Sequence, residues 1–469
     1  MKKRNIFLGF LMGLTALSAQ GSVVRDIPVS AQKKLTMTIY NAGRALVNDV
    51  RAVQLPAGHS ALSFVDISNM VMPTSVLFKS SGVKVLEQNF NFDLLTLDSL
   101  MQKSVGQSVM VEYINPATGE KKQENAELLS YEGGRPILKI GGKIETAYPG
   151  RVIFNQVPTN LSARPSLVFD IYSESALVQD IEVSYLTNGI SWSADYVIEL
   201  DKNSQMDLNG LVTLTNNTSV SYDNVNLQLV AGDVNMVSKS RVMKNSRNVM
   251  MLDAAMPQAA YGMEQEAVSG YYLYSLKRPT DILSNQTKQV SLLSGSKINT
   301  KKTYQYDSPV FYYAEGVVEN VKPTMYLNFA NTKANSLGEA LPKGIMRVYE
   351  KDSRGGLVFV GEDTIDHTAI GQDVRLRLGE DFDITLTGKR TNFKKIDSHT
   401  SQAEFEIKIS NAKTVAQIVR YNQSLPSGWQ MLSESHKSQK ETANSVFWNV
   451  EVPPEGSVVL TFKVMVVSR

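Results

Sequence analysis

The sequence predicts an all-β protein built from antiparallel β-sandwich domains, with a small barrel-like N-terminal subdomain and few short helices. Apolar and polar residues alternate with a period of two in many short segments, as they do in half-buried strands. Turn signals rich in Gly, Asn, Asp and Pro separate these segments. No long segment carries the apolar repeat of a helix, which favours a sandwich over strands that alternate with helices.

Residues 1–21 have the features of a secretory signal peptide. Three basic residues at positions 2–4 precede an apolar run over 6–17, and small residues follow at Ala19 and Gly21. The apolar run is shorter than the ~20 residues that a membrane-spanning helix needs, and no later segment approaches that length. We therefore expect cleavage near Ala19 or Gly21 and a mature chain without a transmembrane span, located in the periplasm, the cell envelope or the extracellular medium.

Composition excludes several classes of protein. There is no Cys, so neither a disulfide framework nor lipid attachment through a cysteine is available. The whole chain has 48 Lys and Arg against 46 Asp and Glu, and loss of the basic leader brings the mature chain close to neutrality. The lysine pairs are scattered, without the concentrated basic surface of a nucleic-acid-binding protein. We expect no nucleic-acid partner.

The first part of the mature chain predicts two small regions. Residues 25–92 are interpreted as an N-terminal β domain because short β-rich runs alternate with turns. Residues 93–157 begin with leucines at helical spacing after Asp93, a plausible N-cap, and so predict a short helix. The rest of that region consists of short strands divided by Gly-Gly pairs, which is typical of a small barrel-like subdomain.

The clearest strand lies at 190–200. Ile190, Trp192, Ala194 and Tyr196 share one parity, and polar residues occupy the other, so Trp192 and Tyr196 are predicted to pack in the core. A second alternating run ends just before it. Asn188-Gly189 separates the two runs and has the residue types of a tight turn, which predicts a β-hairpin over 179–200.

The remaining chain is divided by patterning. Residues 166–237 are interpreted as the first part of a β-sandwich, entered through a Pro-containing linker at 158–165. Residues 238–269 lack sustained periodicity and are predicted to be a disordered insertion. Residues 270–469 again show amphipathic strands and form the rest of the sandwich, with Trp429 and Trp448 expected inside it.

Several motifs resemble a known bacterial family. They are Tyr185–Tyr196 (YLTNGISWSADY), Leu214–Thr218 (LTNNT), Leu229–Asn235 (LVAGDVN), Gly361–Thr368 (GEDTIDHT), Leu378–Asp383 (LGEDFD) and Gly388–Arg390 (GKR). With them the chain resembles the family called domain of unknown function 4139 over about residues 166–469. The resemblance implies an export signal and a β-rich N-terminal region, and it carries no activity. This chain has Ala369 and Gln372 where the family pattern suggests Pro and Glu.

The sequence contains no dense catalytic constellation. Its four histidines, at positions 59, 367, 399 and 436, lack a second His at metal-ligand spacing, and no nucleotide-binding glycine loop is present. His367 with Asp363 and Asp366 is a weak candidate for triad chemistry, because no Gly-x-Ser-x-Gly elbow precedes it. Asp363, Asp366 and Asp383 are weak candidates for glycosidic acid and base residues. We expect no cofactor.

A second interpretation of the acidic residues is a calcium site, since Ca²⁺ takes 6–8 hard oxygen ligands. The weak candidates for it are Glu362, Asp363, Glu380 and Asp381. Solvated loops and strand faces explain the same charges. Two functions remain open: a non-catalytic envelope interaction or assembly module, or an envelope protein that binds or hydrolyses carbohydrate. Their partners would be an envelope protein or a polysaccharide, and the sequence does not indicate the oligomeric state.

Overall fold

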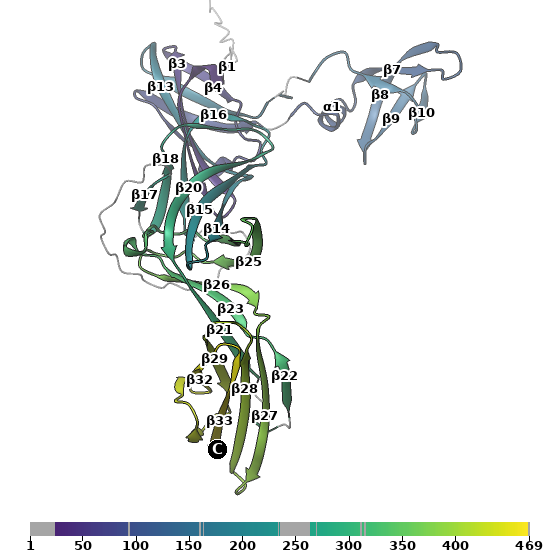
Figure 1. Cartoon of the computed structure of the whole chain (residues 1–469). Coiled ribbons are helices and arrows are strands. Elements are labelled where there is room, and N and C mark those ends of the chain that lie inside the picture. Colours follow the sequence, from purple (N-terminus) through teal and green to yellow (C-terminus); the bar gives the residue numbers. More distant parts are fainter. Residues whose placement is uncertain are drawn as a thin grey trace, which may run out of the picture. The chain divides into compact units, whose positions relative to one another are not determined.

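The computed structural model consists almost entirely of β-strands, which confirms the predicted all-β class (Figure 1). It describes residues 24–91, 94–158, 161–162, 164–232, 234, 263–268, 270–309, 312–313 and 316–467. Across these ranges there is one α-helix, α1 (Leu97–Lys103), and no helix long and apolar enough to cross a membrane. Short 3₁₀ turns occupy Val29–Ala31, Pro73–Ser75 and Lys333–Asn335.

The chain divides into two compact units. Unit 1 comprises Met1–Thr36, Leu46–Asn188 and Thr218–Tyr222. Unit 2 comprises Met37–Ala45, Gly189–Asn217 and Asp223–Arg469. The strands after residue 166 that we assigned to the sandwich therefore divide between the two units, and each unit is described separately below.

Unit 1 contains a four-stranded sheet in the order β1-β4-β12-β6. Its strands are β1 (Val24–Ile27), β4 (Gly58–Val65), β6 (Val83–Asn91) and β12 (Ser166–Ser173). β12 runs antiparallel between β4 and β6, and Ser166 at its start pairs with Asn91 at the end of β6. In the same unit, β13 lies between β3 and β5; these strands are β3 (Arg44–Leu55), β5 (Leu77–Lys79) and β13 (Leu177–Asn188).

A charged pair lies in the core of unit 1. Arg51 is 1% exposed and Asp49 3%, and their side chains are 2.8 Å apart. The Arg51 guanidinium also donates to the backbone carbonyls of Ile27 (2.7 Å) and Val65 (2.9 Å), and it lies 3.8 Å from the Phe64 ring centroid. Each of the three guanidinium nitrogens thus has an acceptor, and the Phe64 ring packs on the group, as burial of a charge requires.

The region that we predicted to be barrel-like is an open five-stranded sheet in the order β10-β9-β8-β7-β11. Its strands are β7 (Ser108–Ile114), β8 (Lys121–Glu132), β9 (Arg135–Ile140), β10 (Lys143–Glu145) and β11 (Arg151–Ile153). β10 and β11 are short edge strands, and no pairing between described strands closes the sheet. The predicted helix exists as α1, but it begins after Thr96, whose Oγ1 accepts from the Ser99 N–H (3.1 Å); Asp93 lies outside the described residues.

The predicted hairpin over 179–200 is wrong. β13 ends at Asn188 and β14 (Ile190–Leu200) begins one residue later, yet β13 pairs with β5 while β14 pairs with other strands. The Asn188 N–H donates to the carbonyl of Met70 (3.1 Å), which ties this end to unit 1. Gly189 has φ +81, so the turn residue was identified correctly, but it redirects the chain between two sheets.

Unit 2 contains a five-stranded sheet in the order β20-β15-β14-β24-β25. Besides β14 its strands are β15 (Gln205–Asn216), β20 (Gln286–Asn299), β24 (Gly344–Lys351) and β25 (Leu357–Ile365). The β14–β24 pair is parallel, and the other pairs are antiparallel. A second group of strands belongs to unit 2 except for residues 32–36 and Tyr222: β2 (Gln32–Tyr40), β16 (Tyr222–Ala231), β17 (Met263–Val268), β18 (Tyr271–Leu276) and β19 (Thr280–Ile282).

Part of the predicted disordered insertion is ordered. Residues 263–268 form β17, which pairs antiparallel with β18 from Met263↔Leu276 to Val268↔Tyr271. These residues fall in the predicted insertion over 238–269, so the prediction is wrong for this strand. Its sequence, MEQEAV, is too polar to show strand alternation, and pairing with β18 supplies the order. The greater part of the insertion, 238–262, lies outside the described residues.

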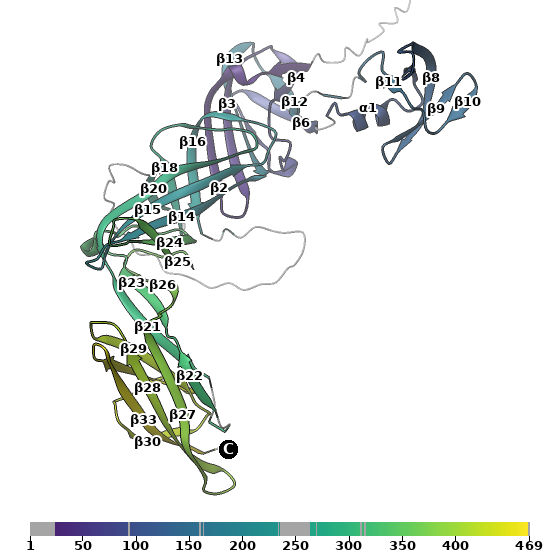
Figure 2. The ribbon, with the colours of Figure 1, turned by 45° about the vertical axis from the view of Figure 1, so that its right-hand side comes forward.

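The C-terminal part of unit 2 is a β-sandwich of two sheets, β26-β23-β21-β29-β32-β31 and β22-β27-β28-β33-β30 (Figure 2). The first has β21 (Lys301–Ser308), β23 (Thr324–Ala330), β26 (Asp373–Glu380), β29 (Gln417–Ser424), β31 (Gln439–Thr442) and β32 (Ser445–Val452). The second has β22 (Val317–Val321), β27 (Ile384–Lys395), β28 (Thr400–Asn411), β30 (Trp429–Glu434) and β33 (Gly456–Val467).

Aromatic residues from both sheets fill the sandwich core. Trp448 of β32 is fully buried and stacks on Phe462 of β33, with ring centroids 4.5 Å apart. Phe462 in turn stacks on Phe405 of β28 at 4.8 Å. The predicted burial of Trp448 is confirmed. Trp429 is only half-buried and donates its indole N–H to the Ala443 carbonyl (2.9 Å), so it lies at the edge of this core.

Candidate functional site

Unit 2 contains a pocket of about 460 Å³ at the point where β24 begins beside β14. Its walls come from the end of β2 and the turn after it (Tyr40–Ala42), from β14 (Trp192–Asp195), from Gly232 and Val234 after β16, from the start of β24 (Lys343–Ile345), and from Thr364 and His367 at the end of β25. The volume lies within the ~300–1,000 Å³ that is usual for ligand sites in proteins. The pocket is therefore large enough for a small molecule or a short stretch of chain.

The pocket exists because β14 begins before its neighbour does. β14 pairs with β15 along its whole length, from Ile190↔Asn216 to Leu200↔Met206, but with β24 only from Ala194↔Gly344 onward. At that first pair the two backbones are in close contact, since a Cβ on Gly344 would lie 2.2 Å from the Ala194 carbonyl oxygen. Ahead of it, no described strand covers the β24 side of β14, and a notch is left.

Trp192 occupies the part of β14 that borders this notch. It is 5% exposed, and Ile190, Ala194 and Tyr196 of the same parity are also buried, so the predicted inward face is confirmed. The Tyr196 hydroxyl donates to the Pro342 carbonyl (2.8 Å), but the indole Nε1 of Trp192 is buried with no hydrogen-bond partner among the described residues. Buried donors of this kind are rare in folded proteins.

We expect Trp192→Ala to lower the free energy of unfolding by about 3 kcal/mol, at the low end for aromatic-to-alanine changes in a core. The low value follows because the ring borders an existing pocket and its N–H has no bond to lose. Ser193→Ala is the control, since Ser193 is exposed and surface changes stay within roughly 0.5 kcal/mol. Chemical denaturation of both variants checks this; equal midpoints would contradict the core assignment.

His367 is fixed at the rim of the pocket. Its Nδ1 accepts the backbone N–H of Lys343 (3.1 Å), and its Nε2 lies 3.3 Å from the side-chain amide of Asn41. The Asn41 atom that faces Nε2 is the side-chain nitrogen, and the donor and acceptor roles in this contact depend on the tautomer of the ring. His367 thus joins the turn after β2 to the start of β24. Of the aspartates considered for a triad, Asp363 accepts the backbone N–H groups of Thr364 and Arg377, and the backbone carbonyl of Asp366 accepts the Thr368 hydroxyl (2.8 Å).

Asp195 lines the pocket from the polar face of β14. Its carboxylate accepts from the Arg347 guanidinium (3.0 Å) and from the Thr213 hydroxyl (2.8 Å). Arg347 also pairs with Glu362 (3.2 Å), and its pKa is raised, mainly by the hydrogen bond to Asp195. The charge of Asp195 is therefore matched within the fold. Glu362, a sequence candidate for calcium, belongs to this ion-pair chain.

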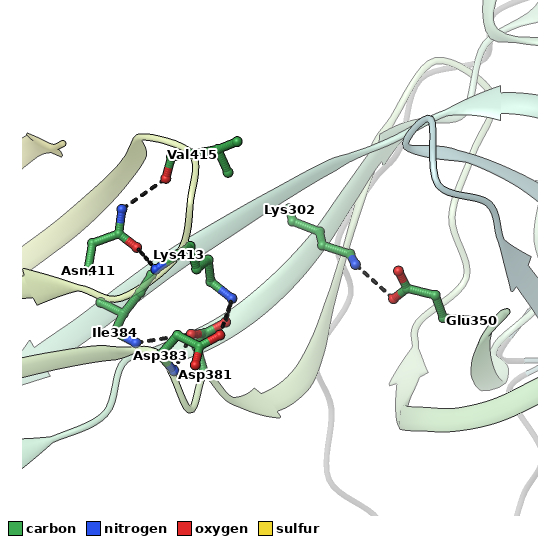
Figure 3. A network of polar contacts seen from close by, with 8 residues as sticks. All are labelled: Lys302, Glu350, Asp381, Asp383, Ile384, Asn411, Lys413 and Val415. Atoms are coloured by element: carbon green, nitrogen blue, oxygen red, sulfur yellow. Dashed lines mark hydrogen bonds and ion pairs between the residues drawn. The ribbon is translucent and has the colours of Figure 1, made fainter. Parts of the chain in front are cut away.

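The acidic residues after β26 form a separate network in the C-terminal part of unit 2 (Figure 3). Asp381 is 6% exposed, and its carboxylate accepts the N–H groups of Asp383 (3.0 Å) and Ile384 (3.1 Å). Lys413 bridges both aspartates, at 2.9 Å from Asp381 and 3.4 Å from Asp383. Asn411 accepts the Lys413 N–H (3.0 Å) and so fixes the loop that carries the lysine. The network holds the β26–β27 turn against the loop after β28.

Figure 3 also shows a second ion pair in unit 2, in which Lys302 of β21 lies 2.8 Å from Glu350 of β24.

Asp363 of β25 joins two neighbouring strands. Its carboxylate accepts the N–H of Arg377 (2.7 Å) and of Thr364 (2.8 Å), which ties β25 to β26. Among the described residues there is no group of three or more acidic or His side chains placed to hold a metal ion.

The structure thus brings together residues that sequence reasoning kept apart. Trp192 and His367 were both singled out, yet for unrelated reasons, and they line the same pocket. Asn41 and Arg347 were missed, because their roles depend on long-range pairing that no local pattern encodes. The parallel register of β24 against β14 would have been the signal, and a single sequence does not reveal it.

A comparison with known families identifies the family to which the chain belongs. The family model described as domain of unknown function (DUF4139) matches residues 181–467, which is more than half of the chain. The protein belongs to this family. No curated protein matches the chain. The DUF4139 match begins within β13 and includes β14, β24 and β25, so the whole lining of the pocket lies in the family region except Tyr40–Ala42.

Proposed function

We propose that this DUF4139 protein is an exported, non-catalytic interaction module of the cell envelope, and that it binds its partner in the pocket of unit 2. The signal-peptide pattern at residues 1–21 supports export to the periplasm or the cell surface. The pocket supports binding, because it combines a usable volume with an open strand edge and fixed polar groups.

The hydrogen bonds of the Asp195 carboxylate are the observation that supports a non-catalytic function. An acid or base catalyst needs a carboxyl group that can exchange a proton with substrate. Asp195, which lines the pocket, instead accepts from Arg347 and Thr213, so its oxygens are committed within the fold. Such a carboxylate positions a strand and shapes the site.

Hydrolysis of carbohydrate is the competing function, and it makes a direct prediction. If Asp383 were a catalytic carboxylate, Asp383→Asn would abolish the release of reducing sugars from envelope polysaccharides. We expect no release above a buffer blank from the wild-type protein, and none from Asp383→Asn, because Lys413 holds Asp383. Turnover in the wild type that Asp383→Asn removes would overturn the non-catalytic function.

Export has its own test. We expect the secreted or periplasmic protein to begin shortly after Ala19 or Gly21, since Ala19-Gln20-Gly21 places small residues at suitable cleavage positions. N-terminal sequencing of protein from the periplasmic fraction measures this. A chain that still begins at Met1 and fractionates with membranes would contradict it.

A further inference from the structure

The notch beside Trp192 leaves part of one edge of β14 without a partner strand among the described residues. Asn217 donates its N–H to the carbonyl of Gly189 (2.8 Å), and Asp201 donates to the carbonyl of Gln205 (2.8 Å). Gly189 and Asp201 flank β14 and are odd-numbered, so both bonds show that odd-numbered residues form their hydrogen bonds toward β15. Because bonding direction alternates along a strand, the N–H and C=O of even-numbered residues face the β24 side. Trp192 is such a residue, and no described strand pairs with it there.

The side chain of Trp192 adds a third polar group, besides the backbone N–H and C=O, that has no partner among the described residues. The indole Nε1 of Trp192 is buried without a partner among the described residues, although buried polar groups are nearly always paired in folded proteins. Trp192 thus offers a backbone donor, a backbone acceptor and an indole beside one pocket. A polypeptide backbone presents donors and acceptors at the matching strand spacing, which a polysaccharide does not.

Charge at the pocket indicates what the peptide carries. Lys343 is exposed at the start of β24, and its ammonium group has no ion-pair partner among the described residues. The carboxylate that lines the same pocket, Asp195, is already matched by Arg347. The pocket therefore has one unmatched positive charge, which favours a ligand with a carboxylate.

From these observations we infer that the pocket of unit 2 is a docking site for an extended peptide segment that carries a carboxylate. The segment adds to the free edge of β14 at Trp192, and its carboxylate faces Lys343. This inference deepens the proposed binding function and rests on it. The carboxylate is an acidic side chain or a chain terminus, which amidated and free peptides distinguish.

The test begins with phage that display random dodecapeptides, selected on the chain without residues 1–21. Selected peptides are synthesised, and their Kd values are measured by fluorescence anisotropy. Each peptide is then N-methylated at one backbone position at a time. If a strand is added, methylation at every second residue of the docked core weakens binding about tenfold, and the residues between are unaffected. A uniform response, or a library that yields no binder, would overturn the inference.

The charge is tested with Lys343→Gln. We expect about threefold to tenfold weaker binding of a peptide that carries the carboxylate, and no change for its amide analogue. Lys351→Gln is the matched control, because Lys351 lies at the other end of β24 and pairs with Glu199 on the surface. Equal effects of the two variants would contradict the placement of the carboxylate. Thermal denaturation of each variant verifies that it is folded.

Two outcomes distinguish failure of the peptide-docking inference from failure of the proposed binding function. Glycan-array binding that Lys343→Gln weakens, with no peptide bound, would overturn the peptide ligand and leave the binding function in place. Release of reducing sugars that depends on pocket residues would overturn the binding function itself. Trp192→Phe adds an independent measure, since it retains a ring and removes the indole N–H; we expect it to weaken peptide binding about threefold to tenfold, and unchanged binding would remove the indole from the site.

Discussion

Arg51→Met should lower the free energy of unfolding of unit 1 by about 3–5 kcal/mol, as removal of one partner of a buried ion pair usually does. The substitution leaves Asp49 buried, 3% exposed, without its cation. It also leaves the carbonyls of Ile27 and Val65 without the guanidinium that binds them. Methionine fills most of the volume, so the effect reports the lost polar contacts. Urea unfolding, followed by a spectroscopic signal assigned to unit 1, measures it.

A matched control separates burial from charge. Arg164 pairs with Asp66 through an exposed guanidinium, and surface pairs contribute only about 0–1 kcal/mol. Arg164→Met should therefore unfold close to the wild-type midpoint. The double variant Asp49→Leu/Arg51→Met should recover much of the loss, because it removes both charges together. Equal destabilisation by Arg51→Met and Arg164→Met would show that the buried pair has no special role.

Trp448→Ala should lower the free energy of unfolding of the C-terminal sandwich by about 3–5 kcal/mol. Trp448 is fully buried between the sheets, and it contacts Phe462 and Tyr421 as well as the Glu434 carboxylate, to which its indole donates (3.1 Å). Truncation therefore opens a cavity and removes a hydrogen bond to a charged group. Loss of the near-ultraviolet circular dichroism of the sandwich at lower denaturant concentration is the readout.

Phe382→Ala is the control for Trp448. Phe382 is 79% exposed, and the Lys322 ammonium lies 4.2 Å from the centroid of its ring. Removal of this aromatic ring should change stability by about 0.5 kcal/mol or less. A shift as large as that of Trp448→Ala would mean that loss of an aromatic ring destabilises the sandwich equally whether or not the ring is buried.

Strand identity could be predicted from the sequence because it is encoded locally. The alternation around Trp192 and Tyr196 fixed the buried face of β14, and the apolar runs of β28 and β33 predicted their inward faces. Partner choice could not be predicted in the same way. Asn188-Gly189 has hairpin residues, yet Asn188 bonds to Met70 and Gly189 to Asn217, and both contacts span long stretches of chain. Local turn preference is weak compared with the burial of whole strands.

The candidate site was predictable only in part for the same reason. His367 was noted because it stands beside aspartates, and its actual partners, Asn41 and the Lys343 backbone, are determined by tertiary structure. The acidic residues are close in sequence, which suggested shared chemistry. In the structure Asp363 joins β25 to β26 through strand N–H groups, while Asp381 binds Lys413 and fixes a turn, so the two residues have separate structural roles.

The pairing of Asn91 with Ser166 has a consequence for how this gene can be edited. The chain leaves the four-stranded sheet at the end of β6 and returns beside it at the start of β12. β6 and β12 therefore pair like the two strands of a hairpin, and the residues between them form one long connection. Loop-closure entropy changes slowly with length, and a hairpin requires only a short connection. We therefore expect that replacing the segment that contains α1 and the open sheet by a tight turn or by a foreign domain leaves the register of β6 and β12 intact.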